Sequence, residues 1–483
     1  MQNENRFFKP MIVWASLIGI LIGGHLAGAA TVTVNPGDSI QAAIDSADPG
    51  DEIILNAGVY EEDINIGDMN APLNRKDNIT LKAADGADVE IHIPNSASRL
   101  ELLGGLGADF GPADRMGFLV YGDGVTVEGI SFTQLSGEVN NFEISVLVTV
   151  ISNDVTFRDC EFIGVGAEAA GDAVGLAVTP LDAIALDQGL GGLATNLTVE
   201  DCVFHDLAYS YGNANFLQEL GVPAPSPEAT LTGCEFYDCG TCINMDDGLA
   251  TLVDCYIHDN QGTGVDASDD GVTLINCRIE NCLEHGVEIS DSESEDDEPQ
   301  ENPIVTIENC LILNCGTDTN HNGINSEHGT ITVKNTVISG STGPNVFFET
   351  EDGRMTTATF DHCDIYNSLI GTAIGTTASP QDVITLTITN SNIVDLDGII
   401  NDAGAFSTIT LDYCNIFVSG EPYLPDQEFI TATNMLSADP LYVDPDNGDF
   451  TLQPGSPMAT AGQGGTYIGS QGLETRTQGW MLH

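Results

Sequence analysis

The sequence predicts an all-β chain: a right-handed parallel β-helix, a solenoid of about twelve coils with a capping helix at its N-terminal end. Three observations lead to this prediction. An eight-residue pattern recurs along most of the 483 residues, its apolar positions alternate with polar ones, and a turn-forming residue divides each copy in two. Each copy is too small to bury its own apolar face, so many copies must stack to form one core.

The repeat reads apolar, Thr, apolar, any residue, Asp/Asn/Gly, Cys, any residue, Phe/Ile. The alternation around the Thr predicts a strand with one buried face, and the end of each copy predicts a second strand. Asp, Asn or Gly fills the fifth position in nine of the eleven clear copies, and these residues tolerate the left-handed conformation of a tight corner. The eleven copies occupy residues 125–132, 155–162, 197–204, 229–236, 250–257, 272–279, 305–312, 331–338, 358–365, 386–393 and 409–416.

The cysteines follow the repeat rather than a disulfide framework. Eight of the twelve stand at the sixth, inward-facing position, and three more form a second column five residues later, at Cys239, Cys282 and Cys315. Buried thiols behave as small apolar side chains. We therefore expect mostly free, stacked thiols, and no paired C-x-x-C set supports a zinc site.

Both ends carry signals for closing the solenoid. Asp38 and Ser39 begin a helix signal that Pro49 and Gly50 end. The apolar face of this helix is Ile40, Ala43, Ile44 and Ala47, and the first strand follows from residue 51. Residues 34–61, the repeats, and the closing segment 438–470 together resemble bacterial secreted proteins of the pectin-lyase-like superfamily. The resemblance implies the parallel β-helix fold and export, and the superfamily includes lyases, hydrolases, epimerases, tailspikes and non-catalytic proteins.

The domain organisation follows from these features. Arg6 and Lys9 precede an apolar run that ends in small residues at 27–29, which predicts a signal peptide over 1–30 rather than a membrane anchor. The β-helix domain spans 31–470, with the cap and first strand in 31–60, and a tail covers 471–483. We therefore expect a secreted bacterial protein, periplasmic or extracellular, with no membrane insertion of the mature chain.

The charge balance restricts the partners. The formal net charge is −61, with only 12 Lys and Arg residues. Such a chain repels nucleic acid and anionic membranes. The acidic surface serves either as a solubilising, salt-adapted coat or as a cation-rich layer that would hold Ca²⁺. A monomer is expected.

The third strand of each coil supplies the candidate site. If its aliphatic residues face inward, the outward side chains Asn244, Asp266, Glu288 and Asn325 align on successive coils, about 5 Å apart. Their oxygen atoms could hold Ca²⁺, and Asp266 with Glu288 could act as a catalytic carboxylate pair. An ordinary solvated acidic face remains the simpler interpretation.

The superfamily resemblance implies two reactions for this strip. Alginate- and chondroitin-type lyases carry Asn and Glu ligands on consecutive coils, but they also need a Lys and an Arg that the strip lacks. Polygalacturonases carry acidic and Gly-His-Gly motifs that Asp246-Asp247, Asp269-Asp270 and His285-Gly286 echo, although the family's Arg-Ile-Lys motif is missing.

Long insertions between coils would flank the site. They are expected at 164–195, 206–228 and 291–303, and the second carries aromatic residues. Tyr209 and Tyr211 could stack on sugar rings, and His285 and His328 lie beside the strip; these four are the candidate substrate-binding residues.

The leading hypothesis is a secreted carbohydrate-binding or polysaccharide-processing β-helix, which if catalytic is a polysaccharide lyase or a glycoside hydrolase acting on an extracellular polysaccharide. The alternative is a non-catalytic surface, structural or adhesin-like protein that uses the β-helix as a rod.

Overall fold

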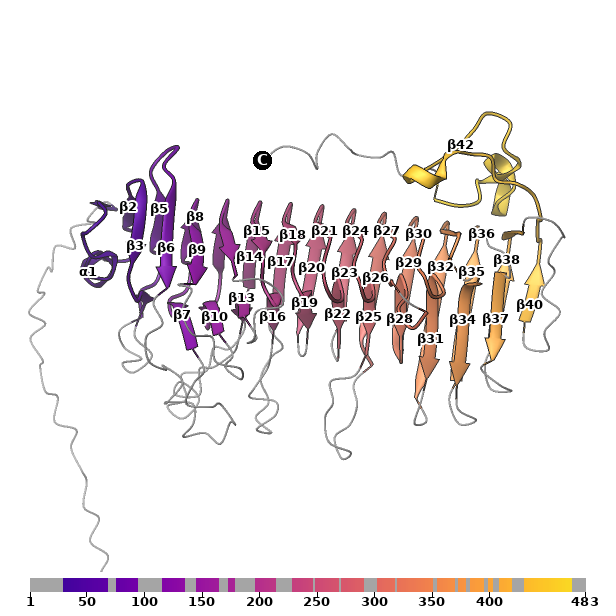
Figure 1. The fold of residues 1–483 in the computed structure, drawn as a ribbon, viewed down its shortest axis with the longest axis horizontal. Helices are drawn as coiled ribbons and strands as arrows, with labels where there is room; N and C mark the ends of the chain where they lie inside the picture. The colour runs from indigo at the N-terminus through magenta and orange to yellow at the C-terminus, as the bar shows by residue number, and fades with distance from the viewer. Residues whose placement is uncertain are drawn as a thin grey trace, which may run out of the picture.

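A computed structural model shows the predicted solenoid as an elongated stack of strands (Figure 1). It describes residues 29–67, 75–93, 115–134, 145–164, 173–178, 196–213, 228–245, 248–268, 271–290, 302–317, 319–350, 354–369, 372–378, 383–394, 398–402, 408–418 and 430–470. The predicted tail lies outside these residues, as does the predicted signal peptide except for residues 29 and 30.

Three long sheets, parallel throughout, run along the stack, and the chain visits them in turn. The first sheet contains the Thr strands: β1 Thr31–Val34, β2 Glu52–Leu55, β5 Thr80–Ala83, β8 Thr126–Glu128, β11 Val155–Arg158, β14 Asn196–Glu200, β17 Glu228–Thr232, β20 Leu249–Val253, β23 Gly271–Ile275, β26 Ile304–Glu308, β29 Gly329–Lys334, β32 Met355–Asp361, β35 Val383–Thr389, β38 Thr408–Asp412 and β40 Ile430–Thr433.

The second sheet holds the strands that end each repeat: β3 Gly58–Glu61, β6 Val89–Ile93, β9 Ser131–Gln134, β12 Glu161–Ile163, β15 Val203–His205, β18 Glu235–Tyr237, β21 Tyr256–His258, β24 Arg278–Glu280, β27 Leu311–Leu313, β30 Val337–Ser339, β33 Asp364–Tyr366, β36 Asn392–Val394 and β39 Asn415–Phe417.

The third sheet completes each coil with β4 Asn65–Ile66, β7 Arg115–Val120, β10 Ser145–Val150, β13 Ala173–Val178, β16 Tyr209–Asn213, β19 Thr241–Met245, β22 Val265–Ala267, β25 Val287–Ile289, β28 Ile324–Ser326, β31 Val346–Thr350, β34 Thr372–Ala378 and β37 Gly398–Asp402. The strands β13 and β16 fall inside residues 164–195 and 206–228, which the sequence predicts to be inserted loops.

The corner between the first and second sheets explains the fifth position of the repeat. All eleven residues at that position have positive φ, and their values lie between 46° and 69°. His362 and Tyr413, the two that are not Asp, Asn or Gly, adopt the same left-handed conformation. The left-handed corner is therefore imposed by the stacking of the coils. Asp, Asn or Gly at this position only lowers the free-energy cost of that conformation.

The core is a set of inward-facing columns. Phe162 and Phe204 stack with ring centroids 4.4 Å apart, and Phe204 and Phe236 continue the column at 4.8 Å. All twelve cysteines are buried and free, which confirms the predicted columns of unpaired thiols. Identical side chains on successive coils thus fill the interior without disulfide bonds.

The N-terminal cap is the helix α1, Ile40–Ser46. Its N-cap residue is Ser39, whose side chain accepts a hydrogen bond from the amide of Ala42 at 3.0 Å. Glu62 accepts a further bond from the amide of Ile40 at 2.7 Å. The buried Ile40, Ala43 and Ile44 confirm the predicted apolar face, which covers the open end of the solenoid.

The closing segment, residues 438–470, folds back over the second sheet near its C-terminal end (Figure 1). It contains the antiparallel pair β41 Tyr442–Asp444 and β42 Asp449–Leu452, with the 3-10 turn η3 Pro445–Asn447 between them, and then the 3-10 turns η4 Pro457–Thr460 and η5 Gln463–Gly465. Tyr442 and Phe450 form an apolar cluster with Leu311, Leu313 and Val337 of the second sheet. The segment therefore covers an outward face of the solenoid.

Candidate functional site

The four predicted strip residues lie on successive strands of the third sheet in perfect register. Asn244 of β19 is the Cα partner of Asp266 of β22, and Asp266 is the partner of Glu288 of β25. Glu288 is in turn the partner of Asn325 of β28. The predicted register is confirmed, with a step of about 4.8 Å between strands. Asn244, Asp266 and Glu288 are half-buried, but Asn325 is only 7% exposed, so the expected solvent-facing column is wrong at its last residue.

Glu288 is a carboxyl with a strongly raised pKa. Its side chain is 25% exposed. Burial, and next the negative charge of Asp266, raise the pKa of Glu288 to about 7, although a hydrogen bond from the Thr263 hydroxyl partly opposes this rise. Near neutral pH this carboxyl therefore exchanges a proton readily, as a general acid or base must.

His285 lies beside Glu288 in a defined tautomer. Its Nδ1 accepts a hydrogen bond of 3.0 Å from the backbone amide of Asn322 on the next coil. The proton of a neutral ring is consequently on Nε2, and Nε2 lies 3.8 Å from Glu288 Oε1. With a side chain only 9% exposed, His285 is buried beside Glu288 and cannot meet a large ligand directly.

The strip has polar neighbours that the sequence analysis missed. Ser290 donates a hydrogen bond to Asp266 at 3.3 Å, Asn322 donates to Asn325 at 3.3 Å, and Thr263 donates to Glu288 at 3.2 Å. Thr263 and Asn322, like His285, stand three residues before a strip residue and directly before a glycine. A Cβ at these glycines would come within 2.6–2.7 Å of a carbonyl oxygen on the next coil, so only glycine fits there. A Thr, His or Asn directly before such a glycine therefore marks, in the sequence, a polar residue beside the strip.

Three of the four candidate substrate-binding residues, including His285, are buried, contrary to the prediction. Tyr211 lies on β16 and faces inward in register with Ile243, fully buried. His328 is 1% exposed, and its Nδ1 lies 3.4 Å from Arg354. Neither ring can stack on an external sugar. Tyr209 is half-buried on the same strand as Tyr211, and His285 is buried at 7% exposed.

The acidic turns predicted beside the strip can be assessed only in part. Asp246, Asp247, Asp269 and Asp270 lie outside the described residues, as does most of the insertion 291–303. Glu327 is described and half-buried. In the part of the chain that the structure describes, no three His, Cys, Asp or Glu side chains gather as a metal site. Calcium on the strip would therefore need the amide oxygens as well as the two carboxylates.

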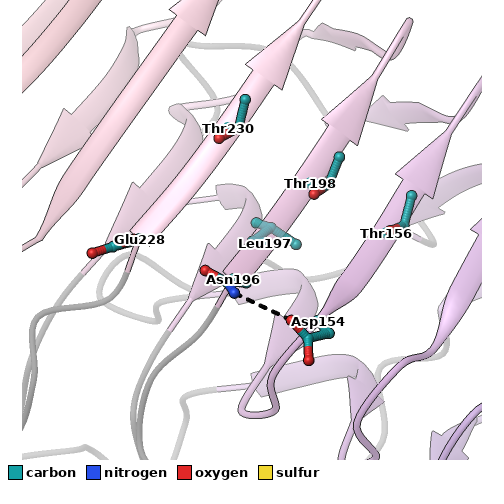
Figure 2. A pocket seen from close by; sticks show the side chains of 7 residues that line it. All are labelled: Asp154, Thr156, Asn196, Leu197, Thr198, Glu228 and Thr230. Atoms are coloured by element: carbon teal, nitrogen blue, oxygen red, sulfur yellow. Dashed lines mark hydrogen bonds between the residues drawn. The ribbon is translucent and has the colours of Figure 1, made fainter.

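A separate hollow of about 460 Å³ lies on the first sheet. Figure 2 shows Thr156, Thr198 and Thr230 in a row across three neighbouring strands. Asn196 donates a hydrogen bond to Asp154 at 3.2 Å near the starts of these strands. This hollow is lined by hydroxyls and by carboxylates that are not paired with each other. The strip on the third sheet, in contrast, has two carboxyls on neighbouring strands, so the strip is the stronger candidate for a catalytic site.

Among the helices within the described ranges, none combines the length and the hydropathy needed to cross a membrane.

Comparisons with known proteins agree with this architecture. Residues 194–298 match the family model described as the right handed beta helix region. No protein of curated function matches the sequence significantly. Solved structures with similar folds include XylC in complex with xylose, at 12% identity and TM-score 0.45, covering 86% of this chain and 87% of that one.

Two further structures have the same level of similarity. The periplasmic alginate epimerase AlgG is 9% identical, with a TM-score of 0.44 and 84% of each chain covered. The catalytic unit of an α-1,3-glucanase from Streptomyces thermodiastaticus is 14% identical, with a TM-score of 0.44, covering 86% of this chain and 70% of that one. Similarity at this level transfers no substrate and no reaction. The family model matches one stretch and the three sheets continue the same coil on both sides of it, so the chain folds as a right-handed parallel β-helix.

Proposed function

We propose that this chain is an exported polysaccharide-processing protein, and that its strip hydrolyses glycosidic bonds. The observation that supports the proposal is the pairing of Asp266 with Glu288 in register, with the pKa of Glu288 raised to about 7. Glycoside hydrolysis requires two carboxyl groups, one of which carries a proton at the working pH. A lyase fits less well, because none of the four strip residues is basic.

In this mechanism protonated Glu288 donates its proton to the glycosidic oxygen of the bound chain. Asp266 attacks the anomeric carbon as the leaving oxygen departs with that proton, and a water molecule deprotonated by Glu288 then displaces Asp266 and releases the sugar. Asp266 and Glu288 are Cα partners on neighbouring strands, whose backbones are about 4.8 Å apart, and retaining glycosidases also hold their two carboxyl groups close together, ~5–5.5 Å apart. The hydroxyl of Thr263 fixes Glu288 Oε2 with a hydrogen bond of 3.2 Å, and His285 Nε2 lies 3.8 Å from Oε1, which is too far for a hydrogen bond.

Calcium binding by Asn244, Asp266, Glu288 and Asn325 is the second candidate function of the strip. The specific observation in its favour is that the charge of Asp266 raises the pKa of Glu288, since repelling carboxylates also attract a cation. A bound cation would hold both carboxylates ionised. The two functions therefore predict opposite effects of Ca²⁺ on a reaction that needs protonated Glu288.

The test is release of reducing ends from a panel of neutral and acidic polysaccharides, with and without Ca²⁺. Hydrolysis should fall by at least ~100-fold in Glu288→Gln and in Asp266→Asn. The matched control is Glu308→Gln, an exposed carboxyl on the first sheet, which should leave the rate unchanged. Wild-type protein that releases no product from any polysaccharide would refute the hydrolase and leave a non-catalytic rod.

A further inference from the structure

A second cavity, of about 260 Å³, lies between the second sheet and the closing segment. Four successive strands supply its sheet side, with Arg278 and Glu280 on β24, Leu313 on β27, Ser339 on β30 and Tyr366 on β33. The turn η3 supplies the other side, including Asp446. The cavity thus exists only while the closing segment is docked, and it lies on a different sheet from the strip.

Arg278 is held rigidly at one end of this cavity. Its Nη2 lies 2.5 Å from Glu280 Oε2, and its guanidinium carbon lies 5.9 Å from the centre of the Tyr256 ring. The hydroxyl of Tyr256 donates to the other oxygen of Glu280. A planar guanidinium fixed by an ion pair and by an aromatic ring loses little freedom when it binds a ligand.

Arg278 presents donors and no acceptor to the cavity. Its Nε is buried without accessible surface, so a ligand in the cavity contacts the remaining part of the side chain, which is 25% exposed. A guanidinium group binds a ligand by donating to an oxygen acceptor. The site therefore needs a molecule that offers a hydroxyl or ether oxygen to Arg278.

The rest of the lining defines the ligand further. Glu280 and Asp446 bring two negative charges against the single positive charge of Arg278, which disfavours an anion. The Tyr366 ring and the Leu313 side chain provide apolar surface, and Ser339 adds a hydroxyl. Vicinal hydroxyls on a partly apolar ring match this combination of planar polar groups and apolar surface.

We propose that this cavity is a secondary binding site for one neutral sugar unit of a polysaccharide. Ring oxygens accept from Arg278, and sugar hydroxyls donate to Asp446. The cavity is smaller than the ~300–1,000 Å³ of sites for larger ligands, so it takes a single unit. The choice of carbohydrate rests on the proposed function, but binding here needs neither Asp266 nor Glu288.

Binding should also be coupled to docking of the closing segment. Residues of η3 line the cavity, so the sugar has its full set of contacts only in the docked state. A ligand that prefers one state shifts the equilibrium toward it. A bound sugar should therefore protect residues 438–470 from proteases.

The experiment measures binding of methyl glycosides of glucose, galactose, mannose and xylose to the full chain by calorimetry and ligand-observed NMR. At least one should bind with a Kd in the millimolar range, and galacturonate and inorganic phosphate should bind more weakly. Ser339→Phe, which fills the cavity from the sheet surface, and Asp446→Ala, at an exposed position on the turn, should each weaken binding at least tenfold. The bound glycoside should slow proteolysis of the closing segment at least threefold.

Glu288→Gln separates this proposal from the proposed function. It should abolish hydrolysis and leave glycoside binding unchanged. Three results would overturn the secondary site: no neutral glycoside binds, an anionic probe binds more tightly, or Ser339→Phe binds as well as wild type while melting at the same temperature. Loss of binding in Glu288→Gln would show that the sugar occupies the strip instead.

Discussion

Replacing Asp364 with Ala should release the closing segment from the solenoid. This carboxyl is 1% exposed on β33. It accepts hydrogen bonds from the amide and hydroxyl of Ser470 at 2.8 and 2.5 Å, from the Tyr442 hydroxyl at 2.5 Å and from Asn392 at 2.7 Å. Two of these partners belong to the closing segment, so Asp364 joins parts of the chain that are 106 residues apart.

The magnitude follows from the groups left behind. In Asp364→Ala the buried donors of Ser470 and Tyr442 lose their acceptor, and hydrogen bonds to a charged group contribute about 1.5–3 kcal/mol each. Burial raises the pKa of Asp364 despite these bonds, because desolvation of the carboxylate costs free energy. The variant no longer has this cost, which offsets part of the free energy lost with the hydrogen bonds. The net cost to docking should be about 3–5 kcal/mol, as for other buried charged groups whose partners are left unpaired.

Hydrogen exchange measures this cost locally. Amides of residues 438–470 should exchange at least ~100-fold faster in the variant, because each 1.4 kcal/mol corresponds to a factor of ten. Exchange in the central coils should stay unchanged, since each coil contacts only its neighbours.

The matched control is Asp412→Ala, whose carboxylate accepts from Thr433 and Asn434 at an exposed corner. It should change exchange little, within about 1 kcal/mol. Wild-type exchange rates throughout 438–470 of Asp364→Ala would refute the role of this buried carboxyl.

Four other outcomes are expected. Ile279→Asp places a charge in a fully buried column and should cost several kcal/mol in unfolding free energy; an unchanged melting temperature would contradict the inward face. Thiol titration of denatured, unreduced protein should find mostly free cysteines, and nearly none would contradict the stacked thiols. Glu288 has a pKa raised from 4.5 to about 7, so its contribution to stability is complete below pH 4.5 and is lost as the pH rises through 7. Across that window wild type should lose about 3 kcal/mol relative to Glu288→Gln, and parallel pH profiles would contradict the shift. If the strip binds Ca²⁺, a hundredfold excess over Kd should stabilise wild type by about 2.7 kcal/mol and an Asp266→Asn/Glu288→Gln double variant much less, with Na⁺ at matched ionic strength as the control; equal responses would exclude the site.

The repeat strands and the strip could be predicted because each has a marker in the sequence. Thr and Cys positions label the first two strands of a coil, and the Gly-aliphatic pairs label the third strand around Asp266 and Glu288. The strands β13 and β16 carry no such marker, so Tyr211 was placed in a loop although it belongs to the core. Alternation over five or six residues is too short to distinguish a strand from an ordered insertion.

The contacts of the closing segment could not be predicted for another reason. Asp364, Asn392 and Asn415 occupy the seventh position of their repeats, where the pattern allows any residue. In most coils this position faces outward, but here the returning chain buries all three. Asn392 also donates to the carbonyl of Ile468, and Asn415 donates to that of Ala438. Periodicity describes neighbouring coils and contains no information about a segment that returns over several of them.

The in-register third sheet has a consequence for how such a protein can evolve. Asn244, Asp266 and Glu288 are spaced by 22 residues, one short coil each. Duplicating or deleting a stretch of that length would preserve every hydrogen-bonded pair on both sides. The carboxyl pair would then move along the rod by one step of about 4.8 Å while keeping its immediate neighbours. In this architecture the distance between the strip and the closing segment can change by whole coils, so gene duplication alone can adjust the spacing between these two parts of the rod.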